Sequence, residues 1–205
     1  KKNLRNYCND TLDLHRKATS LLSNFDEEKA AEVVEKAKEL DICGHEIERS
    51  CIRFIAMEQP LATDLMYIES SIRVISHVKR IAYLCRNIAE SAATIEGMKV
   101  SNKIMRDLEY MADYVQIMLT RGFGSFCNQD MDVARELASD DDKVDDCISV
   151  IKAKAKKRVE KEPTIPPTEM GEFFTPIMVD VLVGGATVFV LDIEQFEKGE
   201  ACIIS

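Results

Sequence analysis

Tryptophan is absent from this 205-residue sequence, and only 8 glycines and 5 prolines occur in it. Residues that interrupt helices are therefore scarce, whereas apolar residues make up 46% of the chain and charged residues 31%. This balance is typical of a folded, helix-rich protein and argues against an intrinsically disordered chain. The length is sufficient to bury a hydrophobic core in one large domain or in two small ones.

Long apolar runs are also missing, since no stretch of about 18 uninterrupted apolar residues occurs. We therefore expect no insertion into a membrane, and no signal peptide is recognisable. The net charge of −9 disfavours nonspecific binding to nucleic acids or anionic membranes, because both carry negative charge. The basic run KAKAKKR at 152–158 is interpreted as a solvated helix face. The first residue is not methionine, so whether a further domain precedes Lys1 stays open.

Disulfide and catalytic motifs are missing as well. The seven cysteines form no Cys-x-x-Cys pair, which favours reduced thiols in a cytoplasmic protein over a disulfide framework. The P-loop, serine-hydrolase and zinc-protease motifs do not occur. The sequence therefore predicts a noncatalytic protein with no certain cofactor.

The first half of the chain has the apolar spacing of three helices, with apolar residues every three or four positions. The first helix is predicted over 3–22, the second up to Pro60, and the third over about 61–90. Ser23, Asn24 or Asp26 is expected to cap the second helix. Pro60 is expected to end it, because proline lacks the amide donor and clashes with the preceding turn. Short turns between three such helices predict an antiparallel bundle.

The sequence then repeats itself, because a shift that carries Asn24 onto Asn128 also carries Asp26 onto Asp130 and Cys43 onto Cys147. The repeat predicts an all-α protein of two tandem three-helix bundles. Residues 1–96 would form the first bundle and residues 97–205 the second. The first two helices of the second bundle would be Met105–Phe123 and Asp130–Lys161.

The last part of the chain allows two interpretations. A proline-bearing connection spans about 161–175, and the stretch IMVDVLVGGATVFVLDIEQFEKGE follows Pro176. Taken locally, β-branched residues on both sides of a Gly-Gly pair indicate a β-hairpin. Taken with the repeat, residues 176–193 form the third helix of the second bundle. We favour the helix, because a lone hairpin is marginal in water and the repeat needs a third helix to cover its core.

Three short motifs surround the turn between the second and third helices. They are Gln59-Pro60 with Ala62 and Asp64-Leu65, then Arg80-Ile81, and then Asn-Ile-Ala-Glu at 87–90. Together they resemble the PhoU family of phosphate-uptake regulators. The resemblance covers residues 1–96 best and residues 173–205 poorly. It implies a pair of three-helix bundles, in agreement with the repeat.

Members of that family often bind iron, zinc or other divalent metals through acids four residues apart on the second and third helices of each repeat. Such acids share one helix face and supply the oxygen ligands that hard cations prefer. The matching positions in this sequence are Ala37 and Asp41, Lys79 and Tyr83, Asp141 and Asp145, and positions near Phe189 and Ile193. The resemblance therefore implies at most a single divalent cation, such as iron or zinc, with Asp141, Asp145 and Asp41 as candidate metal ligands.

Two further expectations concern these acids. The stretch SDDDKVDD at 139–146 is more typical of a solvated acidic surface than of a metal site. Asp41, in contrast, is expected to be buried on the apolar face of its helix, where Lys79 of the facing helix would pair with it in place of a metal.

By the same resemblance, the chain is expected to be a cytoplasmic regulator of phosphate uptake. It would contact the ATPase subunit of a phosphate ABC transporter, or a sensor kinase, and would form a homodimer. Two alternatives stay open, namely a metal-binding helical bundle and a PhoU-like regulatory domain of an ion transporter or transcription regulator.

Overall fold

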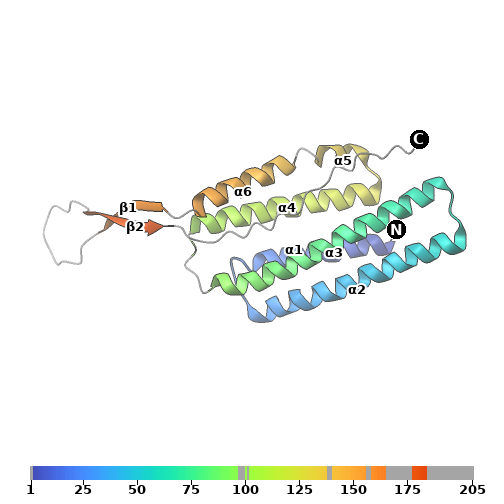
Figure 1. The fold of residues 1–205 in the computed structure, drawn as a ribbon, viewed down its shortest axis with the longest axis horizontal. Helices are drawn as coiled ribbons and strands as arrows, with labels where there is room; N and C mark the ends of the chain where they lie inside the picture. The colour runs from blue at the N-terminus through green and yellow to red at the C-terminus, as the bar shows by residue number, and fades with distance from the viewer. Residues whose placement is uncertain are drawn as a thin grey trace. The chain divides into compact units, whose positions relative to one another are not determined.

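A computed structural model describes residues 2–96, 100, 102–137, 140–155, 158–164 and 177–183 (Figure 1). Its elements in chain order are α1 (Lys2–Ser20), α2 (Glu27–Glu58), α3 (Ala62–Glu96), α4 (Asn102–Asn128), α5 (Met131–Leu137), α6 (Asp141–Ala155), β1 (Arg158–Thr164) and β2 (Ile177–Val183). The chain divides into two compact units, residues 1–147 and 148–205. In the described part of the chain, no helix combines the length and the apolar character that crossing a bilayer requires.

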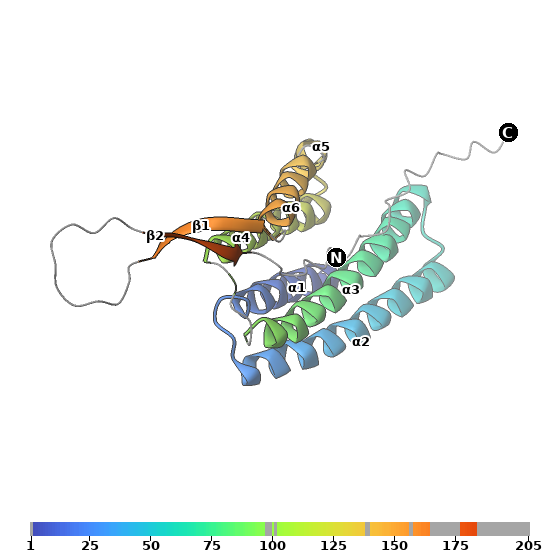
Figure 2. The same cartoon turned by 60° about the vertical axis from the view of Figure 1, so that its left-hand side comes forward.

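Helices α1, α2 and α3 form the predicted three-helix bundle, in which each helix contacts the other two (Figure 2). Their buried residues recur every three or four positions, so each helix turns one stripe toward the others. The core comprises Leu4, Tyr7, Cys8, Leu14 and Ala18 from α1, Leu21 just after it, Val33, Ala37 and Leu40 from α2, and Ile75, Val78, Ala82, Cys85, Ala89 and Ala92 from α3. Burial of each large aliphatic side chain contributes about 1.5–3 kcal/mol to folding.

The ends of α2 follow from local chemistry. The Asp26 carboxylate accepts a hydrogen bond from the Lys29 amide at 3.1 Å, and this bond satisfies one of the unpaired donors of the first turn. At the other end, Gln59 adopts the left-handed conformation (φ 44°, ψ 60°) and Pro60 follows. Asp64 then lies in the first turn of α3, where the helix dipole favours a carboxylate. The cap and the proline turn confirm the sequence prediction.

Helix α4 packs against α1. Gln116 of α4 contacts α1 twice, since its Oε1 lies 2.6 Å from His15 Nδ1 and its amide donates to the Leu12 carbonyl at 3.3 Å. The ring of Phe126 stacks on Tyr67 of α3 with centroids 5.7 Å apart. His15 is 6% exposed, and burial lowers its pKa, so the ring is held neutral between the helices.

The second half of the chain departs from the predicted helices. The helix expected over Asp130–Lys161 is divided into α5 and α6, and β1 begins at Arg158. Gln129, with φ of 60°, separates α4 from α5, and the Asp130 carboxylate accepts hydrogen bonds from the Asp132 and Val133 amides at 3.1 Å. This helix cap fixes the start of α5.

The helix favoured over 176–193 is wrong for residues 177–183, which form β2. β2 pairs with β1 in an antiparallel ladder that runs from Arg158 opposite Val183 to Thr164 opposite Ile177. In β2 the branched residues Ile177, Val179, Val181 and Val183 alternate with period two, and this pattern suits a strand. Local β preference therefore outweighs the repeat. The connection predicted over about 161–175 is wrong for residues 161–164, which form the end of β1. The rest of that connection and residues 184–193, with Phe189 and Ile193, lie outside the described residues.

The predicted helical-bundle fold class is confirmed by α1–α3 and the α4 packing. The internal repeat stays a prediction, as does the division into residues 1–96 and 97–205.

Gly44 of α2 sits where all three helices of the bundle approach one another. A Cβ atom built on Gly44 would lie 2.7 Å from the Tyr7 hydroxyl oxygen and 2.8 and 2.9 Å from Cγ and Cδ of Lys79. Tyr7 is 1% exposed, and among the described residues its hydroxyl has no hydrogen-bond partner. The Tyr7 hydroxyl and the Lys79 stem would both have to shift to admit a Cβ, and because the Tyr7 ring is packed in the core, a side chain at position 44 is unfavourable.

We predict that Gly44→Ala destabilises the protein. Overpacking a core costs about 1–3 kcal/mol, and the better helix propensity of alanine offsets about 1 kcal/mol of that. Gly124→Ala in α4 is the matched control, since no atom lies within 4 Å of its Cβ position. In urea unfolding, Gly124→Ala should raise the free energy of unfolding while Gly44→Ala lowers it. Equal gains in both variants would contradict the steric argument.

Candidate functional site

A polar cluster lies between α2 and α3. Its members on α2 are Asp41, His45 and Glu48, spaced four and three residues apart on one face of that helix, and its member on α3 is Lys79. The Lys79 ammonium of α3 is 2.9 Å from Glu48 Oε1, 3.0 Å from Glu48 Oε2 and 3.5 Å from His45 Nδ1. On its other side, His45 Nε2 is 3.8 Å from Asp41 Oδ2. The Lys79 and Glu48 side chains are only 18% and 19% exposed. Removal of one member of such a pair would leave the other charge partly desolvated and unpaired.

The prediction that Lys79 pairs with Asp41 is wrong, because Lys79 pairs with Glu48. The burial expected for Asp41 is also wrong, since its side chain is 60% exposed. The inward stripe of α2 consists of Val33, Ala37, Leu40 and Gly44. A residue that directly follows Leu40 is turned about 100° away from that stripe, and Asp41 is thus turned away from the core toward solvent.

The remaining predicted metal ligands lie elsewhere. Asp145 is exposed on α6, and Asp141 is the first residue of that helix, with its side chain outside the described residues. At the positions matched in α2 and α3, Ala37 offers no donor atom and the Lys79 ammonium cannot ligate a metal. Over the residues that the structure describes, no group of three His, Cys, Asp or Glu side chains is arranged to hold a metal ion. The assignment of a metal to Asp41, Asp141 and Asp145 stays a prediction.

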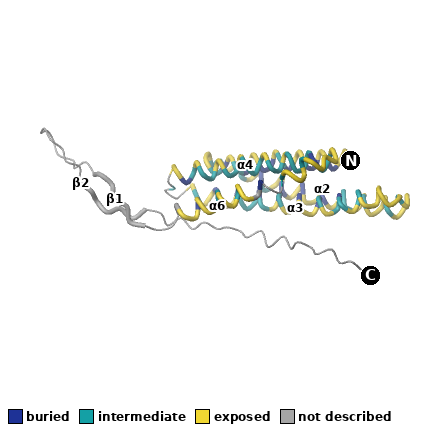
Figure 3. Tube along the Cα trace, turned by 90° about the horizontal axis from the view of Figure 1, so that it is seen from above, coloured by how far each residue is buried: buried dark blue, intermediate teal, exposed yellow. Residues whose placement is uncertain are grey.

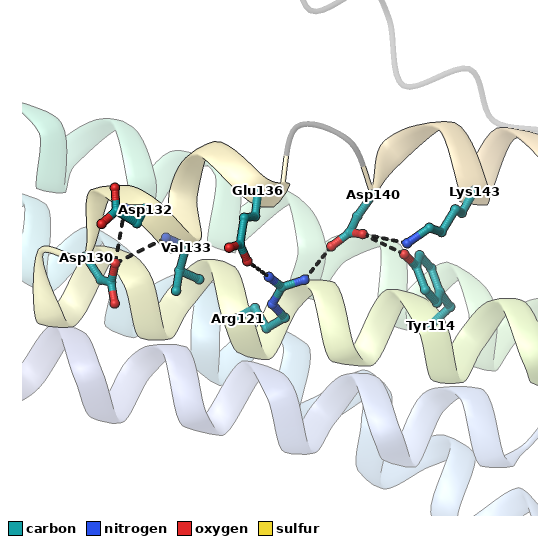
Figure 4. Close-up of polar contacts among 8 residues, drawn as sticks. All are labelled: Tyr114, Arg121, Asp130, Asp132, Val133, Glu136, Asp140 and Lys143. Atoms are coloured by element: carbon teal, nitrogen blue, oxygen red, sulfur yellow. Dashed lines mark hydrogen bonds and ion pairs between the residues drawn. The ribbon is translucent and has the colours of Figure 1, made fainter.

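A second polar network joins α4 to α5 and to the start of α6 (Figure 4). Its centre is Asp140, whose side chain is 9% exposed. Asp140 Oδ1 accepts hydrogen bonds from the Tyr114 hydroxyl and the Lys143 ammonium, both at 2.9 Å, and Oδ2 accepts one from Arg121 at 2.6 Å. Arg121 also donates to Glu136 of α5 at 2.8 Å.

The network is built for structure rather than for proton transfer. Both oxygens of Asp140 are occupied by donors, two of them cationic, and such hydrogen bonds are the strong ones. The hydrogen bonds from Lys143 and Tyr114 hold the pKa of the Asp140 carboxyl below its usual range. This network was not predicted from the sequence, since only the Lys143 contact is local. Tyr114 and Arg121 come from another helix, with no motif to mark them.

Comparison with known proteins places this geometry in a family. The profile of the PhoU domain matches residues 4–92, which span nearly all of α1 to α3. The phosphate-specific transport system accessory protein PhoU homolog 1 of Methanothermobacter thermautotrophicus is 43% identical over 146 residues, which cover 71% of this chain and 67% of that protein. The chain belongs to the PhoU family. The resemblance inferred from the Gln-Pro turn is thereby confirmed.

Other PhoU relatives are more distant. The accessory protein PhoU homolog of Aquifex aeolicus is 33% identical over 63% of this chain and 58% of its own length. That of Rhizobium meliloti is 27% identical over 60% of this chain and 52% of its own length. The aligned part of the chain thus spans between about half and two thirds of these relatives.

A second family profile, that of the cyclic-di-AMP receptor, matches residues 99–199. This match does not overlap the PhoU domain match, and it includes α4, α5, α6, β1 and β2. This second match was not predicted from the sequence. The signal that could have indicated a change of family was the β-branched stretch around Gly184-Gly185, which does not suit a third helix.

We predict that Asp140→Asn lowers the melting temperature at neutral pH, because Arg121 and Lys143 lose their shared carboxylate. The pKa of Asp140 is lower in the folded protein than in the unfolded chain. At pH values just below the usual carboxyl pKa, the unfolded chain therefore binds more protons than the folded protein. The stabilisation by Asp140 is therefore present above a pH of about 4 and is lost as the pH falls through the folded-state pKa.

The matched control for this substitution is Asp142→Asn, at an exposed residue of the same acidic stretch. Melting curves at pH 7 should separate the two variants, and the gap between them should shrink below about pH 4. The same melting temperature for both variants at pH 7 would contradict a stabilising role for the network.

Proposed function

We propose that this chain is a noncatalytic regulator of phosphate uptake that works through protein–protein contacts in the cytoplasm. The observation that carries the proposal is membership of the PhoU family, with a relative named as a phosphate-specific transport system accessory protein at 43% identity. The proposed partner is the ATPase subunit of a phosphate ABC transporter, with a sensor kinase as the other candidate. The homodimer implied by the resemblance stays a prediction.

The surface around the α2–α3 turn supports a role in protein contacts. From residue 45 to residue 70 no residue is buried, and in Figure 3 the end of the α2–α3 pair is coloured as exposed or intermediate. The large apolar side chains exposed there are Ile52 (59%), Phe54 (49%), Met57 (71%), Leu61 (81%), Leu65 (41%) and Met66 (71%). Exposed apolar side chains gathered on one surface are typical of interaction sites.

A groove of about 520 Å³ adjoins this surface on the α1 side. Leu4, Ile47, Phe54 and Ile68 contribute its apolar wall, and Lys2 and Asp64 lie among its polar residues. A groove lined mainly by apolar side chains suits a protein partner better than a small polar ligand.

We predict that the tagged chain captures the cognate transporter ATPase subunit, and that Leu61→Glu weakens the capture at least tenfold. A charge placed in an apolar contact loses its hydration without gaining a partner. The control is Ile117→Glu at an exposed apolar residue of α4, which should bind like the unaltered chain. A pull-down that recovers no ATPase subunit at either high or low phosphate would contradict the proposed partner.

A second candidate function is favoured by one observation, the match of residues 99–199 to the cyclic-di-AMP receptor family. We propose that this part of the chain binds a cyclic dinucleotide and passes its signal to the phosphate regulator. The basic run at 152–158 lies inside the matched range. It would supply positive charge for two phosphates in a chain whose net charge is otherwise negative.

Calorimetric titration of the full chain with cyclic-di-AMP should show saturable binding, and cyclic-di-GMP should bind at least tenfold more weakly. Substitution of Lys152, Lys154 and Lys156 by alanine should weaken the binding and flatten its salt dependence, because fewer charge contacts remain. The absence of binding heat at low salt would contradict this function and would leave the transporter proposal untouched.

A further inference from the structure

Two thiols that are far apart in the sequence meet where the end of α4 packs on α1. They are Cys8 of α1 and Cys127, which lies in the last turn of α4. The Cys8 S–H group donates a hydrogen bond to the Cys127 sulfur. Burial raises the pKa of the Tyr67 hydroxyl on α3, and both sulfurs add to that effect, so the hydroxyl lies close to both of them. We refer to Cys8 and Cys127 as the thiol pair.

Hydrogen bonds between α1 and α4 hold the thiol pair in register. On one side of the pair, Arg5 Nη2 donates to Asn128 Oδ1 at 3.0 Å. On the other side, the Gln116 amide donates to the Leu12 carbonyl at 3.3 Å. The later residue of α1 thus meets the earlier residue of α4, so the two helices run antiparallel. The thiol pair lies between these two contacts, and the packing of α4 on α1 keeps the sulfurs together.

The two thiols differ in their access to solvent. Cys8 is 1% exposed, whereas Cys127 is partly exposed. Burial, together with the neighbouring Cys127, raises the pKa of the Cys8 thiol to about 12, so Cys8 keeps its proton. An oxidant that arrives from solvent therefore reaches Cys127 first. A partly exposed thiol beside a second, protected thiol is the arrangement in which the first is oxidised and the second resolves the product.

We propose that Cys8 and Cys127 are an oxidation site, at which hydrogen peroxide converts the two thiols into a reversible disulfide that ties α4 to α1. In the first step, peroxide oxidises the Cys127 thiol to a sulfenic acid and is itself reduced to water. In the second step, the Cys8 sulfur bonds to the Cys127 sulfur, and the S–O bond of the sulfenic acid breaks. The hydroxyl group leaves with the Cys8 proton as a second water molecule. A thiol reductant restores both thiols by exchange.

The position of Cys127 near the end of a helix allows this bond to form. Cys127 lies two residues before Gln129, whose left-handed conformation (φ 60°) separates α4 from α5. Helix ends open at a lower cost than helix centres, so the last turn of α4 can bring the two sulfurs from a hydrogen bond to the bond length of about 2 Å. Helix α4 also opens the range 99–199 that matches the cyclic-di-AMP receptor family. The disulfide would fix that helix to the PhoU domain, and the inference depends on neither proposed partner nor dinucleotide.

The test treats the reduced full chain with a small excess of hydrogen peroxide and then counts free thiols in denaturant. The unaltered chain should lose two of its seven thiols, and dithiothreitol should restore them. Peptide mapping by mass spectrometry should find the peptide with Cys8 linked to the peptide with Cys127. The oxidised chain should melt about 5–10 °C higher than the reduced chain, because a disulfide that closes a long loop restricts the unfolded state.

Three variants separate the thiol pair from the other cysteines. Cys127→Ser should keep all its thiols, and its melting temperature should not respond to peroxide. Cys8→Ala should form no link and should accumulate a sulfenic acid at Cys127, which dimedone traps. Cys51→Ser, at a partly exposed thiol of α2, is the matched control and should still lose two thiols. Thiol loss in the unaltered chain without a Cys8–Cys127 link would overturn the proposal. The peptide map needs no variant, so this outcome is decisive even if Cys8→Ala does not fold.

Discussion

The close approach of three helices at Gly44 is the constraint on which the arrangement of α1, α2 and α3 depends. The missing Cβ lets the Tyr7 phenol from α1 and the Lys79 stem from α3 reach the same point on α2. One glycine thus couples an apolar contact to a polar one. The Tyr7 ring enters the core, while the Lys79 ammonium reaches Glu48, four residues after Gly44 on the same helix. A side chain at position 44 would disturb both contacts together, because interiors packed to this density do not yield locally.

The two polar clusters of residues 1–147, around Glu48 and around Asp140, stabilise a carboxylate in a similar way. Each places a carboxylate where water is largely excluded and surrounds it with donors from a neighbouring helix. Glu48 receives one ammonium, whereas Asp140 receives an ammonium, a guanidinium and a phenol. The Asp140 network holds the short α5 and the start of α6 on α4, although α5 has no buried residue of its own. Polar contacts thus hold α5 and the start of α6 on α4, whereas apolar burial holds α1, α2 and α3 together.

The parts of this protein that the sequence predicted are those set by local chemistry. Apolar spacing and the Asp26 and Pro60 signals placed α1, α2 and α3 correctly, because caps and prolines act within one turn of the chain. The burial of Asp41 was predicted wrongly because this residue lies one position beyond Leu40 of the buried stripe. The edge of a broad apolar helix face is known only once the position of the neighbouring helix is known. The Lys79–Glu48 pair and the Asp140 network depend on that placement and carry no sequence motif. The β2 strand was missed because the repeat was extended beyond residue 176, into a stretch where local β preference was the better guide.

The turn at Gln59 and Pro60 has a consequence for how the bundle opens. Between Gly44 and Ser71 the two helices are joined by a tight turn yet contribute no buried side chain. Opening free energies within one fold range from near zero to the global value, according to how much apolar contact each segment makes. This end of the α2–α3 pair should therefore separate and reclose many times while the core around Leu40 and Ile75 stays intact. A partner that binds there would meet an already fluctuating pair of helices and would stabilise it by ordering it, without unfolding the rest of the bundle.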